Sequence, residues 1–209
     1  MKPVLIINFK TYKKGKENLK LAKIAEKVDR NIIVGVPAPD IKEISSKTKM
    51  KVYAKHVDPF FPGRNTGFII PEEVKADGAV GTFLNHSEHK LDFRTLKETM
   101  KRCKDVGLKT AVFASSLAEA KKIEKLKPDY LAYEPPELVG GNISVSTAKP
   151  DLIKKISNSL HMKFLVGAGV KNYEDVAASM KLGASGVAVA SGITKAKNPK
   201  REIEKLLGR

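Results

Sequence analysis

Short apolar runs alternate with longer amphipathic segments along the whole chain. The apolar runs are rich in β-branched residues, which is typical of buried strands. The strands that we expect are Val4–Phe9, Ile32–Val36, Lys51–Lys55, Gly78–Leu84, Thr110–Ala114, Tyr130–Tyr133, Phe164–Gly167 and Gly186–Ala190. Helical periodicity predicts the intervening helices at Asn18–Val28, Phe93–Val106, Leu117–Lys125, Pro150–Ser159, Tyr173–Leu182 and Lys200–Leu207. Two short helices are expected at Pro39–Ser46 and Pro71–Ala76, because proline is tolerated only in the first helical turn.

This alternation of eight strand–helix units predicts an α/β protein with a parallel sheet. Eight such units close naturally into a (β/α)8 barrel, and no Gly-x-Gly-x-x-Gly motif follows the first strand to favour an open doubly wound sheet. The length of 209 residues suits one barrel or two smaller domains, but no linker or low-complexity segment divides the chain. We therefore expect a single compact barrel domain over residues 1–209, with shortened second and third helices.

Composition narrows the class of protein. The chain is 42% hydrophobic, which is enough for a sizeable core, and no apolar run approaches the roughly 20 residues that cross a bilayer. The segment Met1–Asn8 continues into Phe9 without a small-residue cleavage site, so we expect no signal peptide and a cytoplasmic location. Cys103 is the only cysteine, which excludes an intrachain disulfide and a multi-cysteine metal site.

A net charge of +16 raises nucleic acids, membranes and anionic metabolites as partners. The lysines are spread along helical stretches such as 13–27 and 121–127 and alternate with glutamates, which is typical of solvated helix faces. Neither a nucleic-acid-binding motif nor interleaved aromatic residues accompany them. We therefore expect no nucleic acid and no membrane as partner, and an anionic small molecule remains.

Polar side chains follow strands at the edge where such barrels place their catalytic groups. Glu134 stands directly after the sixth strand and before Pro135–Pro136, which holds its backbone extended. A carboxylate that faces an apolar interior there suits a general base, although alone it would be interpreted as a solvated loop glutamate.

His86 lies in a strand-to-helix turn in which Ser87 can cap the helix. A helix N-terminus disfavours the imidazolium ion, so a neutral, hydrogen-bonding imidazole is expected.

Lys10 follows the first strand, two residues after Asn8, and an ammonium at the end of a buried strand needs an anion. It binds a developing enolate oxygen or forms an ion pair with Glu88, and the two roles are compatible. His86 and His89 are three residues apart without further ligands nearby, so we expect no metal.

Two strand ends with glycines predict a phosphate site. The sequences VGAG at 166–169 and VASG at 189–192 end the seventh and eighth strands. Glycines let backbone N–H groups approach an anion, and the loops after the last two strands are the recurrent phosphate site of these barrels. The long segment Pro135–Ser146 contains Gly140–Gly141, and we expect it to form a lid over a phosphorylated substrate.

Six blocks of sequence, in order, resemble the triosephosphate isomerase family in its compact archaeal form. The blocks are Asn8–Tyr12, Val57–Gly67, Gly81–Glu88, Tyr133–Leu138, Gly167–Val170 and Ala190–Gly192, and the likeness covers essentially all 209 residues. The resemblance implies a TIM barrel that needs no cofactor. It also implies an isomerase that interconverts dihydroxyacetone phosphate and D-glyceraldehyde 3-phosphate through an enediolate, in glycolysis and gluconeogenesis.

The same resemblance implies roles for individual residues. Glu134 is the expected proton acceptor and His86 the expected neutral electrophile, with Lys10 beside them. The implied substrate-binding residues are Asn8, Phe9, Lys10, Val139, Gly169, Ala190 and Ser191. Archaeal relatives are often tetramers, so we expect a homo-oligomer and favour a tetramer over a dimer.

Two other functions are compatible with parts of the pattern. Another phosphate-binding barrel, such as a synthase or epimerase of a larger sugar phosphate, would share the glycine-bearing loops. Lys10, His86 and Glu134 match the isomerase pattern more closely. A basic nucleic-acid-binding protein on a barrel scaffold would instead show tight, steeply salt-dependent binding to nucleic acid.

Overall fold

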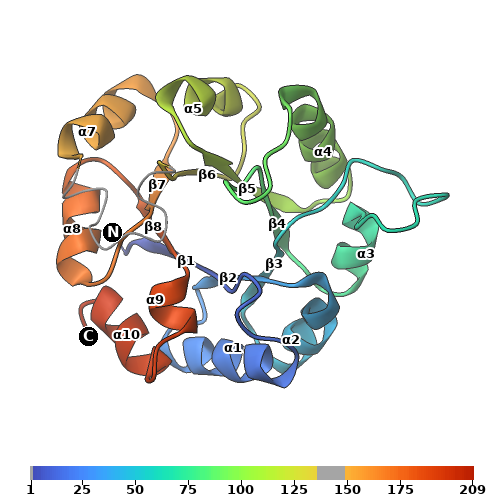
Figure 1. Ribbon diagram of the computed structural model, residues 1–209, viewed down its shortest axis with the longest axis horizontal. Coiled ribbons are helices and arrows are strands. Elements are labelled where there is room, and N and C mark those ends of the chain that lie inside the picture. Colours follow the sequence, from blue (N-terminus) through green and yellow to red (C-terminus); the bar gives the residue numbers. More distant parts are fainter. Residues whose placement is uncertain (1, 136–148) are drawn as a thin grey trace.

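The computed structural model describes residues 2–135 and 149–209. Within them, parallel strands pair in sequence order and close into a barrel through the pairing of β1 with β8 (Figure 1). The strands are β1 (Val4–Asn8), β2 (Ile33–Val36), β3 (Lys51–Ala54), β4 (Gly81–Leu84), β5 (Lys109–Ala114), β6 (Tyr130–Tyr133), β7 (Phe164–Gly167) and β8 (Gly186–Val189). The predicted (β/α)8 barrel is confirmed.

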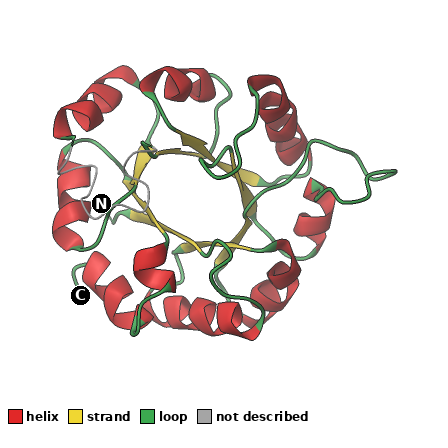
Figure 2. Cartoon of the chain, viewed as in Figure 1, coloured by secondary structure: helices red, strands yellow, loops and turns green. Residues whose placement is uncertain are grey.

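Helices surround the barrel on its outer side (Figure 2). They are α1 (Lys16–Val28), α2 (Ile41–Lys47), α3 (Pro71–Ala76), α4 (Phe93–Asp105), α5 (Leu117–Glu124), α7 (Pro150–Ser159), α8 (Tyr173–Lys181), α9 (Ser191–Thr194) and α10 (Pro199–Leu206). Four of these helices follow an N-cap residue whose side chain accepts a hydrogen bond from a backbone N–H in the first turn: Asp92, Ser116, Asn172 and Asn198. In the described part of the chain, no helix combines the length and the apolar content that a membrane span requires.

The predicted shortening of the second and third helices is also confirmed. The helix α2 has 7 residues and follows a 3-10 turn, η1 (Ala38–Asp40), while α3 has 6 residues. The fourth strand is shorter than the prediction that began at Gly78. That glycine has φ +97° and its N–H donates to the carbonyl oxygen of Lys75, so it closes the turn after α3 instead.

The alternation of side chains along β1 separates two apolar layers. Ile6 packs inside the barrel, whereas Leu5 and Ile7 belong to the larger core between the barrel and the helices. Asn8 continues the inward series and lines the cavity at the end of the barrel. Phe9 continues the outward series and packs in the outer core. Only one of these two neighbouring side chains therefore reaches the site.

Aromatic rings fill the interior of the barrel. The ring centroids of Tyr53 and Phe83 are 5.9 Å apart, and those of Phe83 and Phe113 are 5.5 Å apart. Gly35 and Gly81 make room for these rings, because a Cβ added at Gly35 would overlap Phe83 and one added at Gly81 would overlap Tyr53. The barrel is thus a packed core, and a ligand can bind only at its end.

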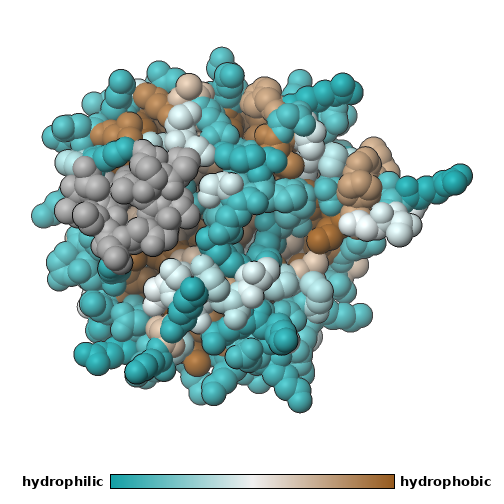
Figure 3. Space-filling model, in the orientation of Figure 1, coloured by the Kyte–Doolittle hydropathy of each residue, from teal (hydrophilic) through white to brown (hydrophobic). Residues whose placement is uncertain are grey.

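The loop from β3 to α3 projects beyond the ring of helices (Figure 1). It carries the exposed aromatic residues Phe60, Phe61 and Phe68. Arg102 lies under this loop, with its guanidinium carbon 3.7 Å from the Phe61 ring centroid, and it forms an ion pair with Glu72. The face seen in Figure 3 is mainly hydrophilic, but hydrophobic side chains are visible near the base of the loop. The loop therefore presents apolar surface to the solvent.

Candidate active site

A cavity of about 180 Å³ lies at the carboxyl ends of the strands. Seven of the predicted site residues, from both halves of the chain, line it: Asn8, Lys10, His86, Glu134, Gly169, Ala190 and Ser191. Each stands at the end of a strand or shortly after one. The side chains that were predicted to act together therefore converge on one cavity.

Glu134 follows β6 directly. Its backbone N–H donates to the carbonyl oxygen of Ala114 at 2.9 Å, which continues the pairing of β6 with β5. Its side chain is 10% exposed, and its Oε2 has no hydrogen-bond partner among the described residues. Gly167 on β7 leaves the space that this carboxylate occupies, because an added Cβ would overlap Cγ and Oε1 of Glu134. A buried carboxylate oxygen without a donor is available to accept a proton from a ligand.

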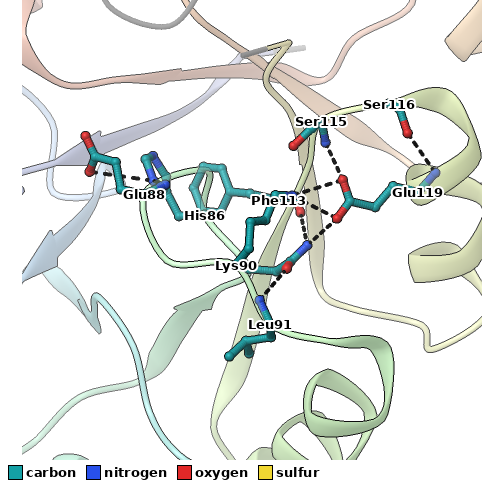
Figure 4. Close-up of polar contacts among 9 residues, drawn as sticks. His86, Glu88, Lys90, Leu91, Phe113, Ser115, Ser116 and Glu119 are labelled. Carbon is teal, nitrogen blue, oxygen red and sulfur yellow. Dashed lines mark hydrogen bonds and ion pairs between the residues drawn. The ribbon is translucent and has the colours of Figure 1, made fainter.

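The imidazole of His86 lies beside this carboxylate. Its Nε2 is 3.3 Å from Oε2 of Glu134, although the two atoms are not aligned as a hydrogen bond. Its Nδ1 accepts a hydrogen bond from the backbone N–H of Glu88 at 3.1 Å (Figure 4). A ring nitrogen that accepts an N–H carries no proton, so the ring is neutral and its proton is on Nε2. His86 is therefore set to donate a hydrogen bond into the cavity.

The prediction that Ser87 caps a helix is wrong. Residues 87–90 form a turn, and α4 begins at Phe93. The N-cap is Asp92, whose carboxylate accepts a hydrogen bond from the N–H of Thr95 at 2.9 Å. The neutral state of His86 therefore follows from the single N–H of Glu88, and not from a helix N-terminus.

Lys10 has a left-handed backbone, with φ 48°. Asn8 supports this conformation, because its Oδ1 accepts the N–H of Lys10 at 2.9 Å. The ammonium group donates to Oε1 of Glu88 at 2.7 Å, so the predicted ion pair is present. Burial acts to raise the pKa of Glu88, but the hydrogen bond and the charge of Lys10 outweigh it and hold that pKa below its usual value. Lys10, at the wall of the cavity, is therefore paired with an ionised carboxylate that does not itself line that cavity.

The ends of β7 and β8 supply backbone groups to the same cavity. Ala168 and Gly169 have φ 83° and 70°, and the short helix α9 begins at Ser191, two residues after β8 ends. A left-handed turn can aim successive N–H groups at an anion, and the first N–H groups of a helix have no acceptor within it. Lys171 adds a cation to this wall. The arrangement suits a phosphate group.

Comparison with known proteins agrees with this geometry. The family model for triosephosphate isomerase matches residues 3–206. The chain belongs to the triosephosphate isomerase family.

Three relatives named triosephosphate isomerase illustrate the membership. The protein from Methanocaldococcus jannaschii is 40% identical, with 98% of each chain covered. The protein from Saccharolobus solfataricus is 40% identical, with 97% of this chain and 93% of the relative covered. The protein from Archaeoglobus fulgidus is 38% identical, with 98% of this chain and 97% of the relative covered. As a member of the triosephosphate isomerase family, the chain is an enzyme of the isomerase class.

Phe9 and Val139, which the resemblance to the triosephosphate isomerase family placed in the site, are not among the described residues that line the cavity. Phe9 is fully buried in the outer core, because it continues the outward series of β1. Its side chain is not part of the cavity wall, so the structure gives no support to the expected role of Phe9 in substrate binding. Val139 lies outside the described residues, as does the expected lid Pro135–Ser146 beyond its first residue.

Lys55 is a residue of the site that sequence reasoning missed. It follows β3 directly, and its Nζ donates to the carbonyl oxygen of Lys10 at 2.8 Å. Burial lowers the pKa of Lys55, although the charges of Glu88 and Asp40 oppose that effect. Lys55 also lines a second hollow of about 340 Å³, which adjoins the first at His86. Its position at a strand end, the criterion that selected Lys10, was the available signal.

The structure offers few groups for a metal ion. Among residues 2–135 and 149–209, no three His, Cys, Asp or Glu side chains gather where they could hold one. His89, which the sequence analysis considered together with His86, instead packs against the ring of His56 at a tilt of 51°, with a centroid distance of 4.3 Å.

Proposed function

We propose that the chain interconverts dihydroxyacetone phosphate and D-glyceraldehyde 3-phosphate by proton transfer through an enediolate. One observation carries the proposal: Oε2 of Glu134, which has no hydrogen-bond partner among the described residues, lies 3.3 Å from Nε2 of His86 on one wall of a small cavity. The names of the archaeal relatives support the same substrates. A single barrel domain over residues 1–209 supplies the site, and no cofactor is needed.

The proton acceptor in this mechanism is Glu134, which removes a proton from the carbon next to the carbonyl group. His86 donates a hydrogen bond from Nε2 to the oxygen on which negative charge develops. The ammonium group of Lys10 stabilises the same charge and remains paired with Glu88. The protonated Glu134 then returns the proton to the neighbouring carbon, which completes the isomerisation.

The phosphate group is held at the other strand ends in this proposal. Backbone N–H groups of Gly169, Ala190 and Ser191 contact it, and Lys171 supplies a positive charge on the same wall. Asn8 lines the same cavity as a substrate-binding residue, and its side chain also fixes the backbone of Lys10. We retain Val139 as a further phosphate contact on the basis of the family resemblance alone.

A coupled assay tests the function directly. The purified chain should convert dihydroxyacetone phosphate to D-glyceraldehyde 3-phosphate without added metal or cofactor. Because the cavity is only about 180 Å³, tetrose, pentose and hexose phosphates should react more slowly than the trioses. A preference for one of the larger sugar phosphates would contradict the proposal and favour an epimerase or synthase.

We also propose that the enzyme is a cytoplasmic homotetramer that acts in glycolysis and gluconeogenesis. The projecting loop supports association, because Phe60, Phe61 and Phe68 leave aromatic surface exposed on one chain. Contiguous exposed apolar surface is typical of contacts between subunits.

Light scattering should therefore give four times the mass of the chain. The substitution Phe61→Asp should shift the mass towards smaller species, because Phe61, a residue that is 65% exposed, would be replaced by a charge at the expected contact. Phe93→Asp is the control, since Phe93 is 45% exposed but lies at the start of α4. A wild-type mass equal to one chain would contradict the proposed assembly.

A further inference from the structure

A partly buried carboxylate outside the cavity joins the loop that carries His86 to the next unit of the barrel. Glu119 lies in the first turn of α5. Its carboxylate accepts hydrogen bonds from Nδ2 of Asn85 at 2.7 Å and from Nζ of Lys90 at 2.8 and 3.0 Å. It also accepts the backbone N–H of Ser115, after β5, at 2.6 Å. Figure 4 shows two of these donors, Lys90 and Ser115, meeting at the Glu119 carboxylate.

Glu119 makes more hydrogen bonds than capping the N-terminus of α5 requires. Ser116 is the N-cap, and its hydroxyl oxygen accepts the N–H of Glu119 at 3.1 Å. In a capping box, the acidic residue three positions later bonds back to the N–H of the cap residue. Here the carboxylate reaches past Ser116 to Ser115, and it also binds Asn85 and Lys90. The last two bonds stabilise the neighbouring loop and not the helix.

Asn85 links this carboxylate to the site. It directly precedes His86 and has a left-handed backbone, with φ 59°, which is uncommon for a residue other than glycine. Its side chain is buried and bonded at both ends, because Nδ2 also donates to the carbonyl oxygen of Phe113 at 2.9 Å and Oδ1 accepts the N–H of Leu91 at 3.0 Å. These bonds hold Asn85 in this conformation at the point where the chain leaves β4 for His86.

The charge of Glu119 strengthens the arrangement. Burial acts to raise the pKa of Glu119, but hydrogen bonds from Lys90, Ser115 and Asn85 outweigh it and hold that pKa below its usual value. The carboxylate is therefore ionised at neutral pH. Hydrogen bonds to an ionised acceptor are shorter and stronger than those between neutral groups.

We propose that Glu119 is a positioning residue for His86. It holds Asn85 and Lys90 against the end of β5, and through Asn85 it orients the imidazole. This inference rests on the proposed function, in which that imidazole donates to the substrate oxygen. Glu119 does not line the cavity, so it acts without touching the substrate.

The substitution Glu119→Gln tests the role, because it keeps the shape of the side chain but replaces one acceptor oxygen with a donor. We expect kcat to fall between about tenfold and a hundredfold, as for a small misplacement of a catalytic group, while KM changes by less than about twofold. The imidazole ¹⁵N resonances of His86 should shift in the same variant. A role confined to stabilising α5 would move neither readout.

Glu124→Gln is the matched control. Glu124 lies at the other end of α5, and its carboxylate accepts the backbone N–H of His161, away from the site. It should lower the melting temperature but leave kcat and the His86 resonances unchanged. If Glu119→Gln behaves like this control, the positioning role is wrong.

Asn85→Gly provides a second test that does not depend on the folding of the first variant. Glycine keeps the left-handed backbone available but removes the bridging amide, so it should reproduce the loss in kcat. When it is combined with Glu119→Gln, kcat should fall little further, because both changes break the same chain of hydrogen bonds from Glu119 through Asn85. Unchanged kcat in Asn85→Gly, or full additivity in the double variant, would overturn the inference. If the wild-type chain did not isomerise triose phosphates, only the proposed function would fail, because the His86 resonances would still report the position of the ring.

Discussion

Replacing Glu134 with glutamine should lower kcat by a factor on the order of 10² to 10⁴, with little change in KM. Glutamine has nearly the same size, so it fits the space beside Gly167, but its amide cannot accept the substrate proton. His86 and Lys10 remain in place, so a phosphorylated enediolate mimic should still bind. Steady-state kinetics and the dissociation constant of the mimic measure the two effects separately.

The melting temperature of Glu134→Gln serves as its control. Oε2 of Glu134 has no hydrogen-bond partner among the described residues, so the loss of its charge breaks no hydrogen bond at that atom. The variant should therefore unfold close to the wild-type temperature. Near-normal turnover in a folded variant would show that another group removes the proton.

Replacing Gly167 with alanine should remove most turnover without changing any polar group. The added methyl group would overlap Cγ and Oε1 of Glu134, so the carboxylate must move away from its present position. A displacement of about 1 Å at a reacting group can cost on the order of 10²-fold in rate. The crowding should also lower the free energy of unfolding by about 1–3 kcal/mol. Kinetics and denaturant unfolding of the same preparation measure both changes.

Gly81→Ala separates the effect on the carboxylate from general crowding. Its methyl group would overlap the ring of Tyr53 inside the barrel, at the start of β4 and away from Glu134. We expect this variant to lose stability while each folded molecule keeps its turnover. Equal kinetic losses in Gly81→Ala and Gly167→Ala would mean that the glycine on β7 has no specific link to the base.

Most of the fold could be predicted because strands and helices follow local patterns. The sixth and seventh strands have the predicted bounds, and the fourth begins three residues late because Gly78 closes a turn. The helix α9 was missed, since the four residues Ser191–Thr194 are too few to show a helical period. Barrel closure followed from the number of units and needed no information about individual contacts.

The sequence could identify the site residues only where they stand at the ends of predicted strands. Lys10, His86 and Glu134 were found because the carboxyl ends of parallel strands meet at one face. The bond from Lys55 to Lys10 spans 45 residues, and a choice among many lysines required the fold. For Phe9 the sequence pattern alone was sufficient, because the alternation of side chains along β1 points its ring away from the cavity.

Contacts that depend on the reach of one side chain could not be predicted at all. The bond between Asn85 and Glu119 spans 34 residues, and the neighbouring sequence does not distinguish Glu119 from any other glutamate in the first turn of a helix. The space that Gly167 leaves for Glu134 depends on the register of two neighbouring strands.

The pairing of β1 with β8 has a consequence for synthesis of the chain on the ribosome. Val4–Ile7 pair with Gly186–Val189, so the first strand to emerge waits for the last before both of its edges are covered. At about 5–20 residues per second, that wait lasts roughly 10–40 seconds. During this interval an open sheet with two free edges is exposed to other nascent chains, and protection by chaperones matters most then.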